Sequence, residues 1–176
     1  SSKIILAVGR FSEAKDYPNL LDAYSKILRN DQPHQLWIIG DGELRDEVVG
    51  LVENTNLHSR VKLLGIKHNI SDWFNAADIF VLSSAWEGFG LVVAEAMSCE
   101  RVVVATDCGG VREVLGSCGY LVPPRNSRLL ASALEDALAL SPVASADLGA
   151  LARKRILANF CLDGISTKWL DLYKRK

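Results

Sequence analysis

Two glutamates eight positions apart, Glu87 and Glu95, are the residues of this sequence best placed to do chemistry. Between them lies an apolar stretch that opens with Gly88 and Gly90 and continues into a helical pattern. Glycines let a backbone come close to a ligand. The free N–H groups of a helix's first turn bind phosphate or carboxylate through hydrogen bonds and the helix dipole. The segment therefore predicts an anion site where a helix begins near Gly90.

The two glutamates are expected to have different tasks. Glu95 lies within an otherwise apolar turn, and burying a carboxylate is costly unless it is bonded. We therefore expect Glu95 to have a defined partner, such as the hydroxyl pair of a ribose. Glu87 lies on the preceding loop, free to reach another part of the same ligand. The alternative is purely structural: Glu87 would be a charged residue at the start of a helix, and Glu95 would form an ion pair in the core. The neighbouring glycines favour a ligand site instead.

Two cations, Arg10 and Lys15, follow the first apolar run on one loop. Each alone would be an ordinary solvated charge, but two cations beside a helix N-terminus favour a diphosphate over a neutral sugar. Gly40-Asp41-Gly42 suggests a dinucleotide fingerprint, yet Arg45 stands where the third glycine is needed. This segment is therefore interpreted as a tight turn and not as a nicotinamide site.

The elements that must position these residues are short, nearly continuous runs of Val, Ile and Leu, typical of strands buried on both faces of a parallel sheet. The expected strands are Ile4–Val8, Leu36–Ile39, Val61–Leu64, Ile79–Leu82, Val102–Ala105 and Tyr120–Val122. Helical patterns alternate with them, which predicts right-handed βαβ units and a doubly wound α/β fold. In such folds ligands bind beyond the carboxyl ends of the strands, where the candidate residues lie.

After the last strand the pattern becomes helical, with helices expected over Ser127–Leu140 and Ala146–Asn159 and a closing segment to Tyr173. There is no internal repeat and no linker, so residues 1–176 are expected to form one domain. The chain begins with Ser1 and not with Met, and we expect sequence to be missing upstream.

Composition narrows the class of protein. Hydrophobic residues make up 49% and charged residues 23%, which is typical of a globular domain. The net charge of −1 argues against a nucleic-acid partner, whose footprint is basic. No apolar run reaches the roughly 20 residues needed to span a bilayer, and no signal-peptide pattern is present.

The cysteines and histidines show no ligand spacing. Irregular intervals among the cysteines indicate free thiols of a reducing, cytoplasmic compartment rather than disulfides or a metal site. The four thiols are Cys99, Cys108, Cys118 and Cys161. The histidines stand in polar or loop-like contexts and are expected at the surface; they are His34, His58 and His68.

Taken together, these residues resemble the C-terminal, nucleotide-sugar-binding domain of the family-four (group 1) retaining glycosyltransferases, whose full enzymes have two facing Rossmann-like domains, the GT-B fold. The resemblance runs from about Ile4 to Val122, and its most specific element is the paired-glutamate motif from Glu87 to Glu95. Supporting matches, in the same order, are Val8-Gly9-Arg10-Phe11 with Lys15, Ile39-Gly40-Asp41-Gly42, Ala76-Ala77-Asp78-Ile79 and Gly109-Gly110-Val111-Arg112-Glu113.

The resemblance implies a role for each matched residue. Arg10 and Lys15 would hold the donor diphosphate, and Glu87 would contact the transferred sugar near the reacting centre. Glu95 would bind the ribose, and main chain near Ile66 would face the base. The implied donor-binding set is Gly9, Ile66, Phe89, Gly90, Leu91, Val92 and Glu95. The family uses neither a metal nor another cofactor, because cations and a helix dipole can neutralise the leaving diphosphate.

Two departures from the family pattern stand out. Asp16 replaces the glycine that usually follows the lysine, which places a negative charge beside the expected diphosphate. Glu100 and Val102 replace a turn glycine and a strand-starting proline, so we expect a changed turn there without chemical consequence.

The implied function is retaining transfer of a sugar from a UDP- or GDP-sugar to a glycan, lipid or other acceptor, as in polysaccharide or lipopolysaccharide biosynthesis. The acceptor would be held by a missing N-terminal domain, so this fragment is expected to bind donor without turnover. Asp163–Tyr173 would be a poorly anchored helix that crosses to that domain. Peripheral membrane association of the full enzyme is left open. The alternatives are a nucleotide-sugar epimerase of the same architecture and a non-catalytic nucleotide-sugar-binding module.

Overall fold

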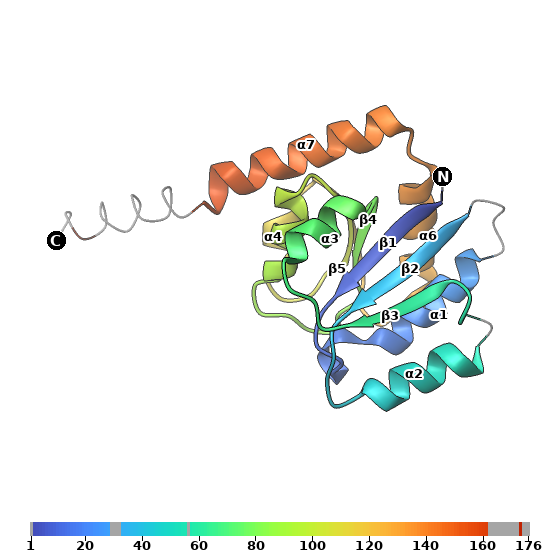
Figure 1. The fold of residues 1–176 in the computed structure, drawn as a ribbon. Helices are drawn as coiled ribbons and strands as arrows, with labels where there is room; N and C mark the ends of the chain where they lie inside the picture. The colour runs from blue at the N-terminus through green and yellow to red at the C-terminus, as the bar shows by residue number, and fades with distance from the viewer. Residues whose placement is uncertain (1, 29–32, 56, 162–172, 174–176) are drawn as a thin grey trace.

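The computed structural model describes residues 2–28, 33–55, 57–161 and 173. Within these residues six strands form one sheet in the order β3-β2-β1-β4-β5-β6, and every neighbouring pair is parallel (Figure 1). The strands are β1 (Lys3–Val8), β2 (His34–Ile39), β3 (Val61–Gly65), β4 (Ile79–Leu82), β5 (Val102–Thr106) and β6 (Tyr120–Val122). The predicted parallel sheet is confirmed, and each strand end lies within two residues of its expected place.

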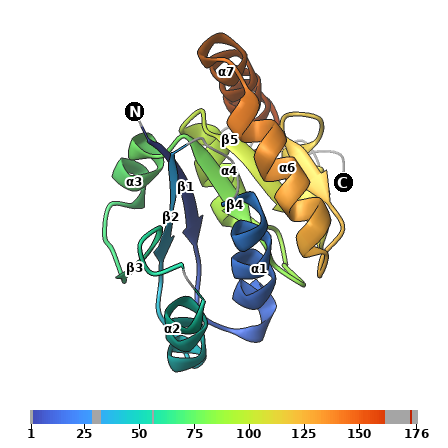
Figure 2. The same cartoon turned by 90° about the vertical axis from the view of Figure 1, so that its right-hand side faces the viewer.

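Helices cover both faces of the sheet, giving three layers (Figure 2). The helices are α1 (Tyr17–Ile27), α2 (Arg45–Asn54), α3 (Ile70–Ala76), α4 (Leu91–Ser98), α5 (Val111–Leu115), α6 (Ser127–Ala139) and α7 (Pro142–Asn159), with a short 3-10 helix η1 (Glu13–Lys15). One core cluster joins the sheet to α1, α2 and α6, and the other joins it to α3, α4, α5 and α7.

The strands are apolar throughout because both faces pack against helices. All residues of β4 and of β5 are buried. Successive strand residues point to opposite faces, so Ile5 belongs to one core cluster and Leu6 to the other. A sheet covered in this way exposes its strand ends and leaves the chemistry to the loops that follow them.

Side-chain caps set where several helices begin. Asp16 takes a left-handed conformation with φ 47°, and its carboxylate accepts a hydrogen bond from the Asn19 N–H in the first turn of α1. Ser141 caps α7 through the Ala144 N–H, with Pro142 as the first helical residue. The predicted start of this helix at Ala146 is therefore wrong by about one turn.

His34 also departs from the prediction. It was expected at the surface, but it is buried at 1% exposure, with Nδ1 3.2 Å from the Tyr24 hydroxyl. Burial lowers the pKa of the His34 imidazole, so the folded chain favours the neutral ring. The burial of His34 was not predicted because its neighbours in the sequence are loop-like, whereas in the structure it is the first residue of β2 and lies under helix α1. His58 and His68 are exposed, as predicted.

The four cysteines are free thiols. Among the described residues, no single helix is long and apolar enough to cross a membrane, although α6 and α7 together meet that test across a bend of 113°. The predicted crossing helix Asp163–Tyr173 lies, apart from Tyr173, outside the described residues.

The strand order fixes where a ligand can approach. The chain runs outward from β1 to β3 and then returns to place β4 on the other side of β1. The order therefore reverses between β1 and β4, and the loops that follow these two strands diverge there. In open α/β sheets this switch point is where ligands bind.

Candidate functional site

Lys15 and Glu87 meet at the switch point. The Lys15 ammonium pairs with Oε1 of Glu87, and the two side chains are only 18% and 15% exposed. Two further bonds join the loops that carry them. The Ala85 N–H donates to the Ala14 carbonyl at 2.8 Å, and the Ser83 hydroxyl donates to the Lys15 carbonyl at 2.7 Å. The loop after β1 and the loop after β4 thus form one unit around a half-enclosed ion pair.

Ser84 fixes the Glu87 carboxylate and was not predicted as a site residue. Its fully buried hydroxyl donates to Oε1 of Glu87 at 2.8 Å, and the Thr106 hydroxyl donates to the Ser84 carbonyl at 2.6 Å. Because Lys15 and Ser84 both bond Oε1, the other oxygen, Oε2, has no protein partner among the described residues. The sequence signal that could have identified Ser84 is its position, since it is a small polar residue just after a strand and three positions before Glu87.

Gly9 and Tyr17 shape the floor beneath Lys15. A Cβ at Gly9 would lie 2.8 Å from Cε of Lys15, so a larger residue there would displace the lysine stem from its path across the end of β1. The Tyr17 hydroxyl donates to the Gly9 carbonyl at 2.9 Å. Burial and then the charge of Glu87 raise the pKa of Tyr17, so its phenol is neutral at physiological pH. Tyr17 is a second residue that sequence reasoning did not assign to the site.

The N-terminus of α4 lies on the same loop as Glu87. Gly90, the residue before the helix, has φ 79° and provides no side-chain cap, so the first N–H groups at Leu91 and Val92 are left to a ligand or water. A second loop holds this one in place. The Gly110 N–H donates to the Gly88 carbonyl at 2.7 Å, and a Cβ at Gly109 would come within 1.9 Å of the Glu87 carbonyl.

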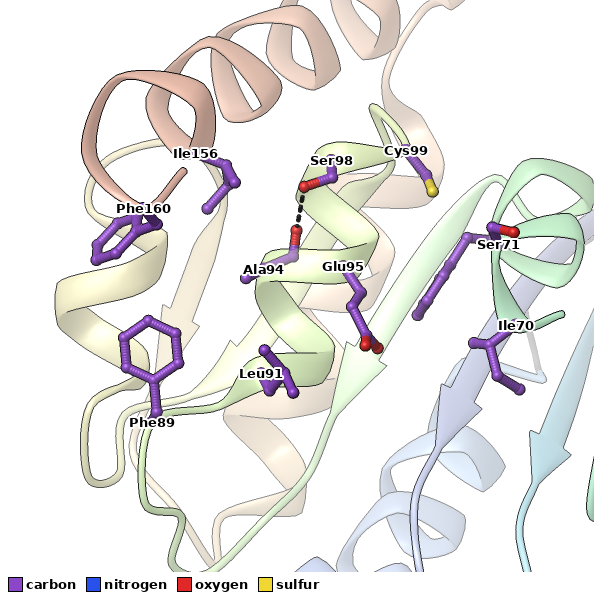
Figure 3. Close-up of a pocket in the computed structure, with 11 residues that line it drawn as sticks. Ile70, Ser71, Phe89, Leu91, Ala94, Glu95, Ser98, Cys99, Ile156 and Phe160 are labelled. Atoms are coloured by element: carbon purple, nitrogen blue, oxygen red, sulfur yellow. Dashed lines mark hydrogen bonds between the residues drawn. The ribbon is translucent and has the colours of Figure 1, made fainter. Parts of the chain in front are cut away.

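A groove of about 630 Å³ runs over the open face of α4, which we name the Glu95 groove (Figure 3). Figure 3 shows Leu91 and Glu95 along α4, with Ile70 and Ser71 of α3 on one side and Phe89 and the end of α7 on the other. The rings of Phe89 and Phe160 meet edge to face with centroids 5.5 Å apart. The full lining is Ile70, Ser71, Phe74, Phe89, Leu91, Ala94, Glu95, Ser98, Cys99, Ile156 and Phe160.

Glu95 is not buried, although its apolar neighbours in the sequence suggested a buried carboxylate. Its side chain faces the groove and is exposed, and it has no hydrogen-bond partner among the described residues. Partial desolvation in the groove raises the pKa of its carboxyl. The apolar sequence was misleading because Leu91 and Glu95, one helical turn apart, share the open face, and Leu91 is itself 65% exposed.

Two predicted residues stand apart from this cluster. The Arg10 side chain is 73% exposed, and its Nε donates to Glu43 at 2.9 Å. Ile66, just after β3, is 70% exposed at the same edge of the sheet. The structure thus brings Gly9, Lys15 and Glu87 together, and it sets Phe89, Leu91 and Glu95 around the groove. Gly90 is buried and Val92 half-buried, so they offer mainly backbone.

Asp16 is engaged elsewhere. Its left-handed backbone, φ 47°, belongs to the region that glycine adopts at no cost. Its carboxylate caps α1 through the Asn19 N–H. Across residues 2–28, 33–55 and 57–161, no three His, Cys, Asp or Glu side chains gather as a metal site would require.

Residues 2–139 match the family of group 1 glycosyl transferases. The chain belongs to this family. Among group 1 relatives, a Campylobacter jejuni N-acetylgalactosamine-N,N'-diacetylbacillosaminyl-diphospho-undecaprenol 4-alpha-N-acetylgalactosaminyltransferase is 35% identical over 139 residues, which are 77% of this chain and 37% of the relative. The chain therefore spans about a third of that enzyme's length.

Solved structures of group 1 enzymes agree in fold. Staphylococcus aureus TarM, in a complex with Fondaparinux, alpha-GlcNAc-glycerol and UDP, superposes with a TM-score of 0.90 at 27% identity over 98% of this chain and 35% of TarM. Anabaena HepE, in a complex with UDP-glucose, gives a TM-score of 0.84 at 26% identity over 100% of this chain and 50% of HepE. The predicted Rossmann-like half of a GT-B architecture is confirmed.

Proposed function

We propose that this chain is the donor-binding half of a retaining glycosyltransferase and takes a UDP-sugar. The observation that carries the proposal is the Lys15–Glu87–Ser84 cluster at the switch point, directly before the uncapped N-terminus of α4. A fixed cation and free helix N–H groups suit a diphosphate leaving group. The free Oε2 of Glu87 suits a hydroxyl of the transferred sugar.

The Glu95 groove is assigned to the nucleoside. Its lining combines apolar surface with one carboxylate that lacks a protein partner, the arrangement expected of a site for a ribose and a base. Glu95 would accept hydrogen bonds from the ribose hydroxyls, and main chain at Ile66 would face the base. UDP is favoured over GDP because TarM and HepE are found with UDP or UDP-glucose.

Arg10 is assigned to the diphosphate after a change of partner. In the free chain it pairs with Glu43 at the surface, where ion pairs contribute little. A diphosphate offers a bidentate partner of higher charge, so Arg10 would leave Glu43 when the donor binds. The proposal requires no metal ion, because Lys15, Arg10 and the helix dipole supply the neutralising charge.

The acceptor domain, retention and the pathway belong to the intact enzyme. The proposal expects an N-terminal domain that completes the site, and it expects this chain alone to bind donor without transfer. A cytoplasmic location and a role in polysaccharide or lipopolysaccharide synthesis stay predictions. An epimerase would convert the nucleotide-sugar without any acceptor, so product analysis separates the two activities.

The test uses the intact enzyme with its UDP-sugar and an accepted glycan, and it follows the anomeric proton of the product by NMR. We expect the anomeric configuration of the product, axial or equatorial, to be the same as that of the donor sugar. We also expect the transfer rate to be unchanged by EDTA. Glu87→Gln should lower the transfer rate by about 100-fold or more, which corresponds to loss of a group that acts in the transition state. Inversion of configuration, or normal rates in Glu87→Gln, would contradict the assignment.

A further inference from the structure

A second groove, of about 640 Å³, opens beside the Glu87 loop and shares no lining residue with the Glu95 groove. We name it the Trp86 groove. It is enclosed by the loop after β1, the first turns of α1, the start of α2, the Ala85–Trp86 segment and the loop before α6. Trp86 precedes Glu87 in the chain, so this groove lies next to the reacting centre assigned above.

Trp86 gives the groove an aromatic wall. Its side chain is 49% exposed, and its indole N–H has no hydrogen-bond partner among the described residues. An exposed tryptophan beside a polar cavity offers an apolar face and one donor to the same ligand. A sugar ring, with a face of C–H groups and a rim of hydroxyls, fits that combination.

The charge of the groove argues against a second anion site. Four carboxylates line it and, among the described lining residues, Arg125 is the single cation. A phosphate or a nucleotide would be repelled by this excess of negative charge. The carboxylates are those of Glu13, Asp16, Asp22 and Glu47.

A metal ion fits no better. Asp16 is used as the cap of α1, and Asp22 bonds both Lys26 and the Ser127 hydroxyl. A neutral ligand with many hydroxyl groups remains, since hydroxyls donate to carboxylates without adding charge.

Two polar groups at the groove have unused hydrogen-bonding capacity. Nδ2 of Asn19 is buried without a partner in the wall. Arg125 holds a left-handed backbone, φ 55°, and its exposed guanidinium has no partner among the described residues. Polar atoms without hydrogen-bond partners and residues with strained backbone are more frequent at binding sites than on other parts of a protein surface.

We infer that the Trp86 groove binds a neutral saccharide, the sugar of the acceptor that receives the transferred residue. The inference rests on the proposed function, because it needs the donor on the other side of Glu87. It changes the expectation that acceptor contacts belong only to the missing domain. The donor's own sugar is the other source of the same chemistry, and the experiment separates them.

The experiment is an NMR titration of this chain with methyl glycosides of glucose, galactose and N-acetylglucosamine and with their 1,4-linked disaccharides. Each titration is run on the free chain, with saturating UDP and with saturating UDP-glucose. The indole N–H resonance of Trp86 is assigned by its absence in Trp86→Phe. We expect this resonance to shift with at least one saccharide, in the presence as well as the absence of UDP. Trp86→Ala should weaken saccharide binding by about fivefold to tenfold and leave UDP affinity within about twofold.

Matched variants on one helix locate the site. Glu47→Gln removes a groove carboxylate from α2, whereas Glu53→Gln removes an exposed carboxylate of the same helix outside the groove. Only Glu47→Gln should weaken the saccharide. The inference is overturned if UDP binds but no saccharide shifts Trp86, or if saccharide binding is equal in Trp86→Ala. Saccharide binding that UDP-glucose abolishes but UDP leaves intact assigns the groove to the donor's sugar and overturns the inference. Saccharide binding that UDP itself abolishes places the saccharide in the nucleotide site and overturns it as well. Absence of UDP binding, by contrast, tells against the proposed donor site.

Discussion

Glu87 and Glu95 stand at the two ends of one motif, yet the fold treats them in opposite ways. Glu87 is 15% exposed, and Lys15 and Ser84 hold one of its oxygens. Glu95 is exposed in its groove, has no partner among the described residues, and has a pKa raised by desolvation. One carboxylate is fixed before any ligand arrives, and the other lacks a partner until a ligand supplies one.

The two cations repeat the contrast. Lys15 is enclosed and paired within the site, whereas Arg10 is exposed and paired with Glu43 at the surface. Under the proposed function this difference implies a division of work. Lys15 and Glu87 at the reacting centre are preorganised, whereas Arg10 and Glu95 are available to take a new partner when the nucleotide binds. Preorganised groups around developing charge contribute more to catalysis than groups that must reorganise.

The largest effect is expected from Gly109→Ala, which breaks the fixed half of the contrast. The new Cβ would meet the Glu87 carbonyl at 1.9 Å, and the backbone has φ 53°. Strain and overpacking together should lower the free energy of unfolding by about 2–4 kcal/mol, measured by urea denaturation. Gly50→Ala, in α2, is the control: its Cβ would make only an ordinary contact with Nδ2 of Asn54 at 3.9 Å, and it should stabilise by about 0.5–1 kcal/mol. Equal effects would show that the Glu87 loop is not held as described.

Lys15→Ala and Arg10→Ala test whether the enclosed cation matters more than the exposed one. Loss of a charge-assisted hydrogen bond at Lys15 should weaken UDP about 10–100-fold. Arg10→Ala should weaken it no more than about fivefold, because its charge is screened by solvent. Calorimetry on the two variants gives the ratio directly. A larger loss at Arg10 would reverse the division between fixed and mobile groups.

Ser84→Ala tests how far the fixed position of Glu87 matters, because it removes one hydrogen bond to the carboxylate and leaves the carboxylate itself in place. The lost hydrogen bond should lower the free energy of unfolding by about 1 kcal/mol. In the intact enzyme the turnover rate should fall while the KM for the donor stays constant, because the proposed function makes Ser84 the residue that positions a catalytic carboxylate. Ser59→Ala, at an exposed turn, is the matched control. Should KM rise and the turnover rate stay the same, Ser84 would be a binding residue instead.

Glu95→Gln should give the smallest effect, one of pH dependence. Because the pKa of Glu95 is raised in the folded chain, the folded state keeps this proton to a higher pH than the unfolded chain does. Its contribution to stability therefore falls as pH rises through the carboxyl range. The free energy of unfolding of the parent chain minus that of Glu95→Gln, measured by urea unfolding between about pH 4 and pH 7, should therefore fall as pH rises. A difference that rises with pH would mean that Glu95 has a stabilising partner.

Most of the fold could be predicted from the sequence because buried parallel strands leave continuous apolar runs. β4 was predicted to the residue, and β1 within one residue. The start of α7 was missed although Ser141 and Pro142 form a recognisable cap, since the apolar pattern begins later. The burial of His34 was not predicted because one residue at the start of a strand shows no apolar periodicity that would indicate burial.

The residues of the candidate site could be named from the sequence, but the contacts between them could not. The glycine and glutamate pattern located the loop, yet Lys15 and Glu87 lie 72 positions apart, and no local pattern encodes their pairing. The exposure of Glu95 was missed because the apolar neighbours in sequence are not its neighbours in space. Ser84 and Tyr17 act through single hydrogen bonds, which leave no signature in spacing.

The central claim is that this chain holds a nucleotide-sugar donor, and calorimetric titration of the chain with UDP, GDP, ADP and NAD tests it most directly. The account predicts that UDP binds, that Glu95→Ala weakens it by about tenfold or more, and that UDP at 100 times its dissociation constant raises the free energy of unfolding by about 2.7 kcal/mol. Absence of binding by every diphosphonucleoside, or UDP binding with equal affinity to Glu95→Ala, would contradict it.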